Sequence, residues 1–567
     1  METCHESAVD TETRAWQPEL PAALTLAVST LAACGGGGGG SSPAPIPDPV
    51  PPPVPPPVST APQAVRLLLQ SQFSASDAEV TAVQNLGAAA WLDQQFSAPA
   101  SITGWDWMMG KGYNAPEFSA MASITDPMVW YQLIATPDAM RKRVALALSE
   151  IMVASANGVN GIAYRSFAMA GYWDTLVQNA FGNFRTLLEA VTLNPAMGVY
   201  LNTRGNQKED AATGRQPDEN YAREVMQLFT IGLYELNPNG SNRLGANNMP
   251  IETYDQAMVS SLAHVFTGYN FDKNAAGGGN LNYLRVPMTV TASLHSTVAV
   301  QFLGATIPAN TGPTEALKIA LDTIFNHPNV GPFFGRQLIQ RLVTSNPSPA
   351  YIARVSAAFN NNGAGVRGDM KAVIRAVLQD AEAVSATQAV QANWGKLREP
   401  IVRFVQWART FKATSTNDAW KINDLSSDAT RLGQSPLRSG SVFNFFRPGY
   451  VPPNTALAGA ALVAPEFQIT NESSVAGYIN FMQTVIKNGY SDLVPNYSAE
   501  LALVADVDKL LDRLNLLLTA GQLSGTTLAT IRTTVAGLAS ATAAEQLIRV
   551  QAAVLLVMAA PQYLVQK

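Results

Sequence analysis

The stretch YWDTLVQNAFGNFRTLLEAVTLN (residues 172–194) repeats apolar side chains three or four positions apart. This spacing places them on one face of an α-helix, because a helix completes a turn every 3.6 residues. The same period recurs at 138–155, 313–325, 331–343 and 544–560. Segments rich in Asn, Gly and Pro, such as NPNGSN and NHPN, separate these stretches and mark turns. The sequence therefore predicts a mainly α-helical protein.

One region departs from the helical period. Residues 282–308, NYLRVPMTVTASLHSTVAVQFLGATIP, alternate apolar and polar side chains and are rich in Val and Thr. This pattern is typical of strands, so we expect a small β hairpin or sheet inserted in a large multi-helical body. No fixed repeat is visible. The best candidate for an internal domain boundary is the polar stretch FKATSTNDAW (411–420). We treat residues 63–567 as one helical body.

Composition excludes several classes of protein. The chain has 567 residues, of which 47% are hydrophobic and 14% charged, so most of it is expected to fold. A net charge of −5 without basic clusters argues against a nucleic-acid partner. The two cysteines, Cys4 and Cys34, precede the body, so the body contains no disulfide and no cysteine zinc site. There are only four histidines and no HExxH motif, which excludes a zincin.

The N-terminal region predicts a cellular address. In LPAALTLAVSTLAACGGGGGG (20–40), an apolar run leads into Leu31-Ala32-Ala33-Cys34, which resembles the lipobox of bacterial lipoproteins. The run suits a signal peptide and is too short to span a bilayer. The resemblance implies that residues 1–33 are cleaved and that Cys34 is acylated and holds the protein at the cell envelope. Because Gly35 and not aspartate follows Cys34, the outer membrane is the expected location.

Residues 1–20 disagree with this interpretation, because they carry five acidic residues and one arginine where a signal peptide is basic. Either Met1 is not the true start, or the segment is a low-complexity linker with a chance cysteine. Residues 34–62 favour the lipoprotein, since a glycine run and then a proline run follow the cysteine. We expect them to form a disordered stalk, extended where proline dominates.

The stretch RQPDENYAREVMQLFTIG (215–232) is the most unusual in the body. Pro217 suits the first position of a helix, and a helical projection buries Tyr221, Val225, Leu228 and Phe229. Glu219 and Arg223 are one turn apart on the opposite side and predict an exposed ion pair. Asn220, Glu224 and Gln227 border the apolar face. A carboxylate there either ties helices together or lines a cleft with a raised pKa, and both alternatives stay open.

This stretch resembles the signature of the bacterial family called domain of unknown function 1800. Further blocks resemble the family in order along the body, namely 66–96, 263–271, 326–355, 365–383, 441–453 and 560–567. The resemblance implies a large, mostly helical, exported protein, with no established reaction and no known cofactor. Family members are often encoded beside a sulfatase-like family, which implies a possible partner in the envelope. The chain departs from the family pattern at Asp218, Gln227, Ser296 and Val300.

His264 and His295 are the histidines with the clearest chemical potential. With Glu224 they would make a two-histidine, one-carboxylate metal site, although their spacing carries no local ligand signature. A lone histidine is more often a core or surface group than a ligand. Likewise, KLREPIVRFVQWAR (396–409) offers basic residues to an anion, but a solvated helix face is the commoner explanation. Four tryptophans could form a platform for a glycan, but the core is their expected place: Trp105, Trp107, Trp173 and Trp407.

Two functional hypotheses remain. In the first, the protein is an envelope-anchored binding or scaffold protein whose signature helix is architectural. In the second, it is an extracytoplasmic, hydrolase-like enzyme acting on a polymer or an anionic substrate. The enzyme hypothesis uses Glu224 as acid and base with Arg223, His264 and His295 as catalytic or metal-binding groups. Asn220 and Arg398 are then the candidate substrate-binding residues.

Overall fold

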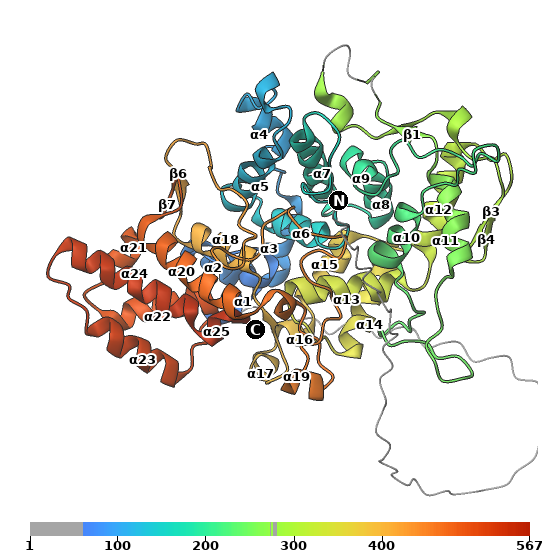
Figure 1. The fold of residues 1–567 in the computed structure, drawn as a ribbon. Coiled ribbons are helices and arrows are strands. Elements are labelled where there is room, and N and C mark those ends of the chain that lie inside the picture. Colours follow the sequence, from blue (N-terminus) through green and yellow to red (C-terminus); the bar gives the residue numbers. More distant parts are fainter. Residues whose placement is uncertain (1–59, 273, 276–279) are drawn as a thin grey trace, which may run out of the picture. The chain divides into compact units, whose positions relative to one another are not determined.

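The structure, a computed structural model, describes residues 60–567 except 273 and 276–279. These residues form twenty-five α-helices and four two-stranded antiparallel sheets (Figure 1). The mainly α-helical fold predicted from the sequence is confirmed. The predicted signal peptide (1–33), the lipidation site Cys34 and most of the predicted stalk lie outside the described residues.

The first part of the body is entirely helical. Thr60 begins it, because its hydroxyl accepts the backbone N–H of Gln63 and caps the first helix. The predicted helical stretch 172–194 forms two helices, since the Asn183 side chain accepts the N–H of Arg185 and starts a new one. The helices are α1 (Ala61–Ser71), α2 (Asp77–Leu86), α3 (Ala88–Ser97), α4 (Gly104–Gly110), α5 (Thr125–Ile134), α6 (Ala139–Ser149), α7 (Arg165–Asn179), α8 (Phe184–Thr192) and α9 (Pro195–Tyr200).

The middle part contains the signature and the predicted β insert. Strands β3 (Val300–Phe302) and β4 (Ala305–Ile307) form a hairpin, and β1 (Tyr269–Asn270) pairs with β2 (Thr289–Val290). The β insert predicted at 282–308 is therefore confirmed. The helices are α10 (Asn220–Glu224), a π-helical segment (Val225–Thr230), α11 (Gln256–Ala263), α12 (Pro313–Asn326), α13 (Val330–Leu342), α14 (Pro349–Asn360), α15 (Met370–Leu378), α16 (Ala381–Val384) and α17 (Ala386–Ala389).

The C-terminal part of the chain contacts the beginning of the body. Pro62 at the start of α1 lies beside Gly521, and strand β5 (Lys396–Leu397) pairs with β8 (Val565–Gln566) at the end of the chain. The remaining elements are α18 (Pro400–Thr410), β6 (Thr414–Ser415), α19 (Ala456–Gly459), α20 (Glu472–Asn488), β7 (Leu493–Val494), α21 (Ser498–Leu501), α22 (Val507–Thr519), α23 (Gly525–Ala536), α24 (Ala543–Ala559) and α25 (Pro561–Leu564).

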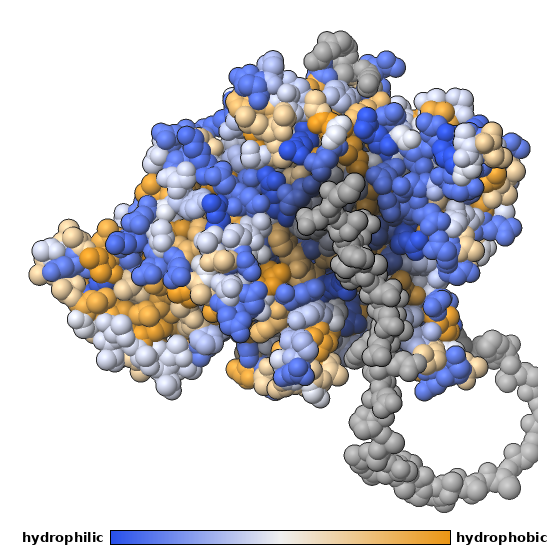
Figure 2. All heavy atoms as spheres, viewed as in Figure 1, coloured by the Kyte–Doolittle hydropathy of each residue, from blue (hydrophilic) through white to orange (hydrophobic). Residues whose placement is uncertain are grey.

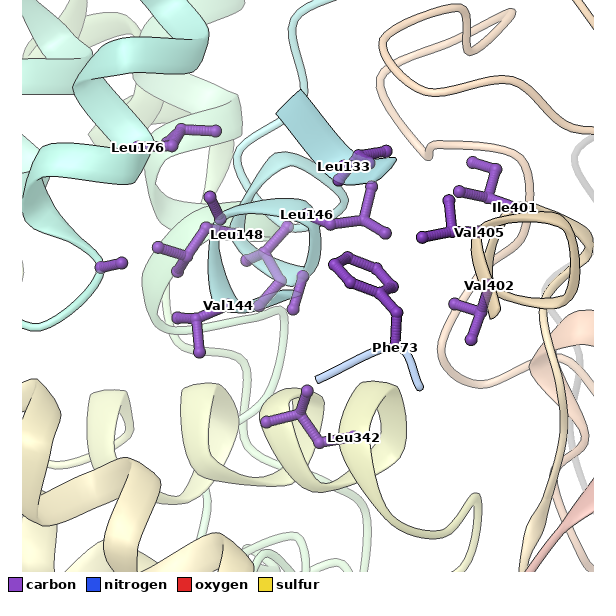
Figure 3. Close-up of a cluster of buried hydrophobic side chains, with 14 of the residues drawn as sticks. Phe73, Leu133, Val144, Leu146, Leu148, Leu176, Leu342, Ile401, Val402 and Val405 are labelled. Atoms are coloured by element: carbon purple, nitrogen blue, oxygen red, sulfur yellow. The ribbon is translucent and has the colours of Figure 1, made fainter. Parts of the chain in front are cut away.

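Helix α6 lies within the hydrophobic core. Its residues Val144, Leu146 and Leu148 pack among side chains from distant parts of the chain, including Phe73 after α1 and Leu342 in α13 (Figure 3). The four tryptophans singled out in the sequence, Trp105, Trp107, Trp173 and Trp407, are all at most 4% exposed, which confirms their predicted place in the core. Among the described residues, no helix combines the length and hydrophobicity needed to cross a membrane.

Candidate functional site

The signature helix begins later than its sequence predicts. Pro217 precedes the helix, and α10 starts at Asn220. Asp218 explains the difference, because its Oδ1 accepts the backbone N–H of Asn220 at 2.9 Å. Its own N–H donates to Oδ1 of Asn206 at 2.9 Å, which fixes the loop from a second direction. The placement of Pro217 at the first helical position was therefore wrong.

The π-helical segment after α10 changes which residues are buried. Tyr221, Val225 and Phe229 are buried as predicted, but Met226 is buried as well and Leu228 remains partly exposed. A π turn contains more residues than an α turn, so the buried face shifts within the helix. The Tyr221 hydroxyl donates to Oγ1 of Thr192 at 2.7 Å and joins the signature to α8.

Glu219 and Arg223 form the predicted ion pair, at 3.1 Å between Oε2 and Nη2. The pair also ties the signature to α11. The Ser260 hydroxyl donates to Oε1 of Glu219, and the Gln256 amide donates to Oε2 at 2.7 Å. Arg223 Nη2 donates to Oε1 of Gln256 at 2.9 Å. These contacts give both residues an architectural role.

Glu224 differs from Glu219 and Arg223, because one of its carboxylate oxygens has no hydrogen-bond partner. Its side chain is half-buried, and Oε2 is enclosed without a hydrogen-bond partner. Burial raises the pKa of Glu224, against the opposing charge of Arg223. Its charge also contributes, after burial, to the raised pKa of Tyr200 and Tyr254, each about 12. Burial therefore favours the protonated form of this carboxyl group relative to an exposed glutamate. Asn220 beside it is exposed.

His264 and His295 line one small pocket that is open to solvent. His264 Nδ1 lies 2.9 Å from Oε2 of Glu209 and 3.1 Å from Oγ of Ser296. His295 is buried, and its Nδ1 donates to the carbonyl oxygen of Thr267 at 3.0 Å. The remaining lining residues are mostly apolar, namely Val265, Val298, Val300, Ile307, Pro308, Thr311 and Ala316.

Glu224 does not join the two histidines. Glu219 contacts Ser260, Arg223 contacts Gln256, and Gln227 contacts Tyr254, so the signature runs opposite to the direction of α11. His264 follows the other end of α11 and is therefore remote from Glu224. Within the described part of the chain, no group of three or more His, Cys, Asp or Glu side chains is placed to hold a metal ion. The predicted metal site of His264, His295 and Glu224 is not formed.

Arg398 lies away from Glu224 and from the pocket of the two histidines. Its side chain is 2% exposed, with Nη1 donating to Oε1 of Gln406 at 2.9 Å and the guanidinium over the Tyr563 ring. An arginine enclosed in this way fits a structural role and does not meet a substrate from solvent. Lys396 and Arg403 are buried too, so the expected solvated face at 396–409 was wrong. Burial lowers the pKa of Arg398.

Two groups were missed in the sequence. Glu209 is the carboxylate beside His264, and residues 206–210 carry no motif that would have identified it. The other is a buried ionic cluster in the core around Lys396, which bonds Glu399 at 3.2 Å and Glu466 at 3.1 Å. Glu150 and Arg341, 3.4 Å apart, complete it with Arg143. A signal existed, because α6 carries charges inside an apolar run, yet only the fold brings the partners together.

Comparison with known proteins places this helical architecture in a family. The family described as "Protein of unknown function (DUF1800)" matches residues 66–565, nearly the whole described body. The chain belongs to this family. No curated protein and no solved structure matches it.

Proposed function

We propose that this protein is a lipid-anchored protein of the bacterial cell envelope, whose helical body binds another envelope protein at the outer membrane. The lipobox-like residues 31–34 and the proline-rich residues after them support the anchor. Helix α1 begins at Ala61, immediately after that segment, as a tethered body requires. Several buried acyl chains would make the attachment effectively permanent.

The observation that carries the binding role is the outward face of α24. Leu547 is 36% exposed and Ile548 54%, and Leu555, which follows Ile548 by two turns on the same side, is only partly buried. Residues 550–566 contain no charge. Figure 2 shows apolar residues gathered over these C-terminal helices. Such a surface favours a protein partner, because the centres of protein interfaces are apolar and depleted in charge.

A lipid surface fits this face less well. Helices that lie on membranes combine an apolar face with Lys, Arg and aromatic residues at the water boundary. Helix α24 contains no Lys, Trp, Tyr or Phe, and its single arginine, Arg549, is buried and donates to backbone carbonyls. The family resemblance names a first partner to test, the sulfatase-like protein often encoded nearby.

The anchor is tested by metabolic labelling with a fatty-acid analogue followed by membrane fractionation. The wild-type protein should carry the label and sediment with the outer membrane. Cys34→Ser should lose both the label and the membrane association, because it removes the acylated thiol. An unlabelled wild-type protein that retains residues 1–33 would contradict the anchor.

The binding role is tested by co-expression with the sulfatase-like protein and co-purification in detergent. Ile548→Asp should abolish co-purification, because it places an unpaired charge at the centre of an apolar interface. Val390→Asp is the matched control, since Val390 is 76% exposed in another part of the body. Equal capture by the two variants would count against α24 as the binding face.

A second candidate function is an extracytoplasmic enzyme. One observation favours it, namely the pocket that His264 and His295 both line.

A further inference from the structure

The two histidines of the pocket use the same ring nitrogen, Nδ1, for their hydrogen bonds. In each ring, Nδ1 faces a hydrogen-bond acceptor, the Glu209 carboxylate for His264 and the Thr267 carbonyl for His295. An imidazole that donates from Nδ1 carries its lone pair on Nε2 when neutral. Both rings therefore offer an acceptor nitrogen on the edge opposite their bonded one, and both rings line the same pocket.

The carboxylate of Glu209 determines this arrangement at His264. Although partial burial opposes ionisation, hydrogen bonds, including those from Ser296 and His264, lower the pKa of Glu209. An ionised carboxylate accepts only, so the proton between the two groups belongs to Nδ1. Within the described residues Nε2 of His264 has no hydrogen bond, and the side chain is 18% exposed. The nitrogen is thus available to a molecule entering the pocket.

We propose that His264 is the proton acceptor of an acid–base site in this pocket, oriented by Glu209, for a small hydroxyl-bearing ligand or a water molecule. Nε2 takes the hydroxyl proton, the oxygen keeps the electron pair of the broken O–H bond, and the imidazolium is stabilised by the Glu209 carboxylate. When the ligand leaves, the proton returns from Nε2 to the same oxygen, so the cycle balances. The site goes beyond the binding role of α24 and does not depend on it.

The other lining residues define the ligand. Val298, Val300 and Ile307 give the pocket an apolar wall, so the part of a ligand that contacts this wall is apolar. His295, only 3% exposed, has a pKa lowered by burial and acts as a neutral acceptor that orients the hydroxyl. The Ser296 hydroxyl donates to Oε2 of Glu209 at 2.8 Å and helps to hold the carboxylate in place. Glu209 is a positioning residue.

The ring protonation is tested directly by ¹⁵N NMR of the protein in detergent, whose few histidines, His264, His295 and His327 after Cys34, give few signals. His264 and His295 should both show the Nδ1–H form at pH 8. The titratable group facing His264 is Glu209, and Glu209 also acts electrostatically on His295. Finding His264 protonated on Nε2 at pH 8 would overturn the proposal, whatever the stability of any variant.

Reactivity gives a second test, using diethyl pyrocarbonate and mass spectrometry to follow each histidine. His264 should be acylated severalfold faster than His295, because its Nε2 is reachable and supported by a carboxylate. Glu209→Gln should slow the reaction at His264 severalfold while leaving His327, between α12 and α13, unchanged. Glu224→Gln is the control and should leave the rate at His264 unchanged. An equal rate in Glu209→Gln with an intact fold rejects the role of Glu209.

The ligand class is tested with 1-propanol as the probe. Titration into the labelled protein should shift ring signals of both His264 and His295 together, and the Glu209→Gln variant should weaken the response. Shifts at His295 alone, or none at either ring, would reject a hydroxyl-bearing ligand in this pocket.

Discussion

Two glutamates in the middle of the body show how much the role of a residue depends on its immediate partners. Glu209 lies in a loop without a motif, yet it bonds His264 and Ser296 and stays ionised. Glu224 lies in the family signature, yet its enclosed oxygen has no partner and burial raises its pKa. Glu209 is therefore the carboxylate that pairs with a histidine, while Oε2 of Glu224 has no hydrogen-bond partner.

We expect Glu224→Gln to be at least as stable as the wild type at pH 8. An acid whose pKa is raised on folding binds more protons in the folded state than in the unfolded state. Its contribution to the free energy of unfolding is therefore fully present below the unfolded pKa of about 4.3. That contribution is lost as the pH rises through the folded pKa. A glutamine side chain does not ionise, so the variant does not lose stability in this way as the pH rises. Thermal unfolding from pH 4 to pH 8 should show a difference that grows with pH. A lower melting temperature for the variant at pH 8 would show that the carboxylate has a partner.

At the scale of elements, the signature is a short α-helix continued by a π-helical segment that ends against α13. The backbone leaves the segment at Gly232 with a φ of +72°. A Cβ at this position would lie 2.7 Å from Cε2 of Phe333, so the turn needs glycine for both its backbone angle and its side-chain space. The glycine that ends the signature is thus a packing requirement.

We expect Gly232→Ala to lower the free energy of unfolding by about 1–3 kcal/mol, since it combines a left-handed backbone with a steric clash. Gly214→Ala is the matched control, because Gly214 has a φ of +73° and open space around its Cβ position. The control should lose clearly less. Denaturant unfolding of the two variants measures the difference, and equal losses would mean that Phe333 moves aside.

At the scale of the whole molecule, a buried ionic cluster joins segments far apart in the sequence. Lys396 bonds Glu399 and Glu466 and also donates to the carbonyl oxygen of Arg341 at 2.7 Å. Gln434 donates to Glu399 Oε2 at 3.0 Å. Although burial opposes ionisation, the charges of Lys396 and Arg143 bring the pKa of Glu399 down to about 2. The cluster fixes how the central and C-terminal helices meet.

Glu399→Gln should lower the free energy of unfolding by about 3–5 kcal/mol at pH 7, because it removes the negative charge that buried Lys396 and Arg143 share. Because the pKa of Glu399 is lower in the folded state, its carboxylate stabilises the fold above the unfolded pKa of about 4.3. This stabilisation is lost as the pH falls toward 2. The difference between variant and wild type should therefore shrink in acid. Asp508→Asn, which breaks an exposed pair with Arg532, is the control and should cost about 0–1 kcal/mol. A similar small loss in Glu399→Gln would contradict the cluster's structural role.

Local patterns made much of the fold predictable. The stretches 313–325, 331–343 and 544–560 form helices close to their predicted bounds, because their apolar period follows from local geometry. The β insert was predictable for the same reason. The break at Asn183 and the late start at Asn220 were not, since both depend on side-chain caps that compete with the helical pattern.

The candidate site was predictable only in part. His264 and His295 were identified from their type and do line one pocket. Their carboxylate partner was assigned to Glu224, whereas Glu209 occupies that place, because the direction of α10 against α11 is a tertiary property. The basic residues at 396–409 were expected in solvent for a similar reason, since burial of a charge requires partners that the local sequence does not name.

The sequence by itself determined the helical class, the family and the positions of most helices, because periodicity and motif blocks are local and repeat along the chain. Only the tertiary structure decided which charged groups meet, which carboxylate serves His264 and which face of α24 remains open. Those outcomes depend on distances between residues tens to hundreds of positions apart, and such distances are set by how the helices pack together.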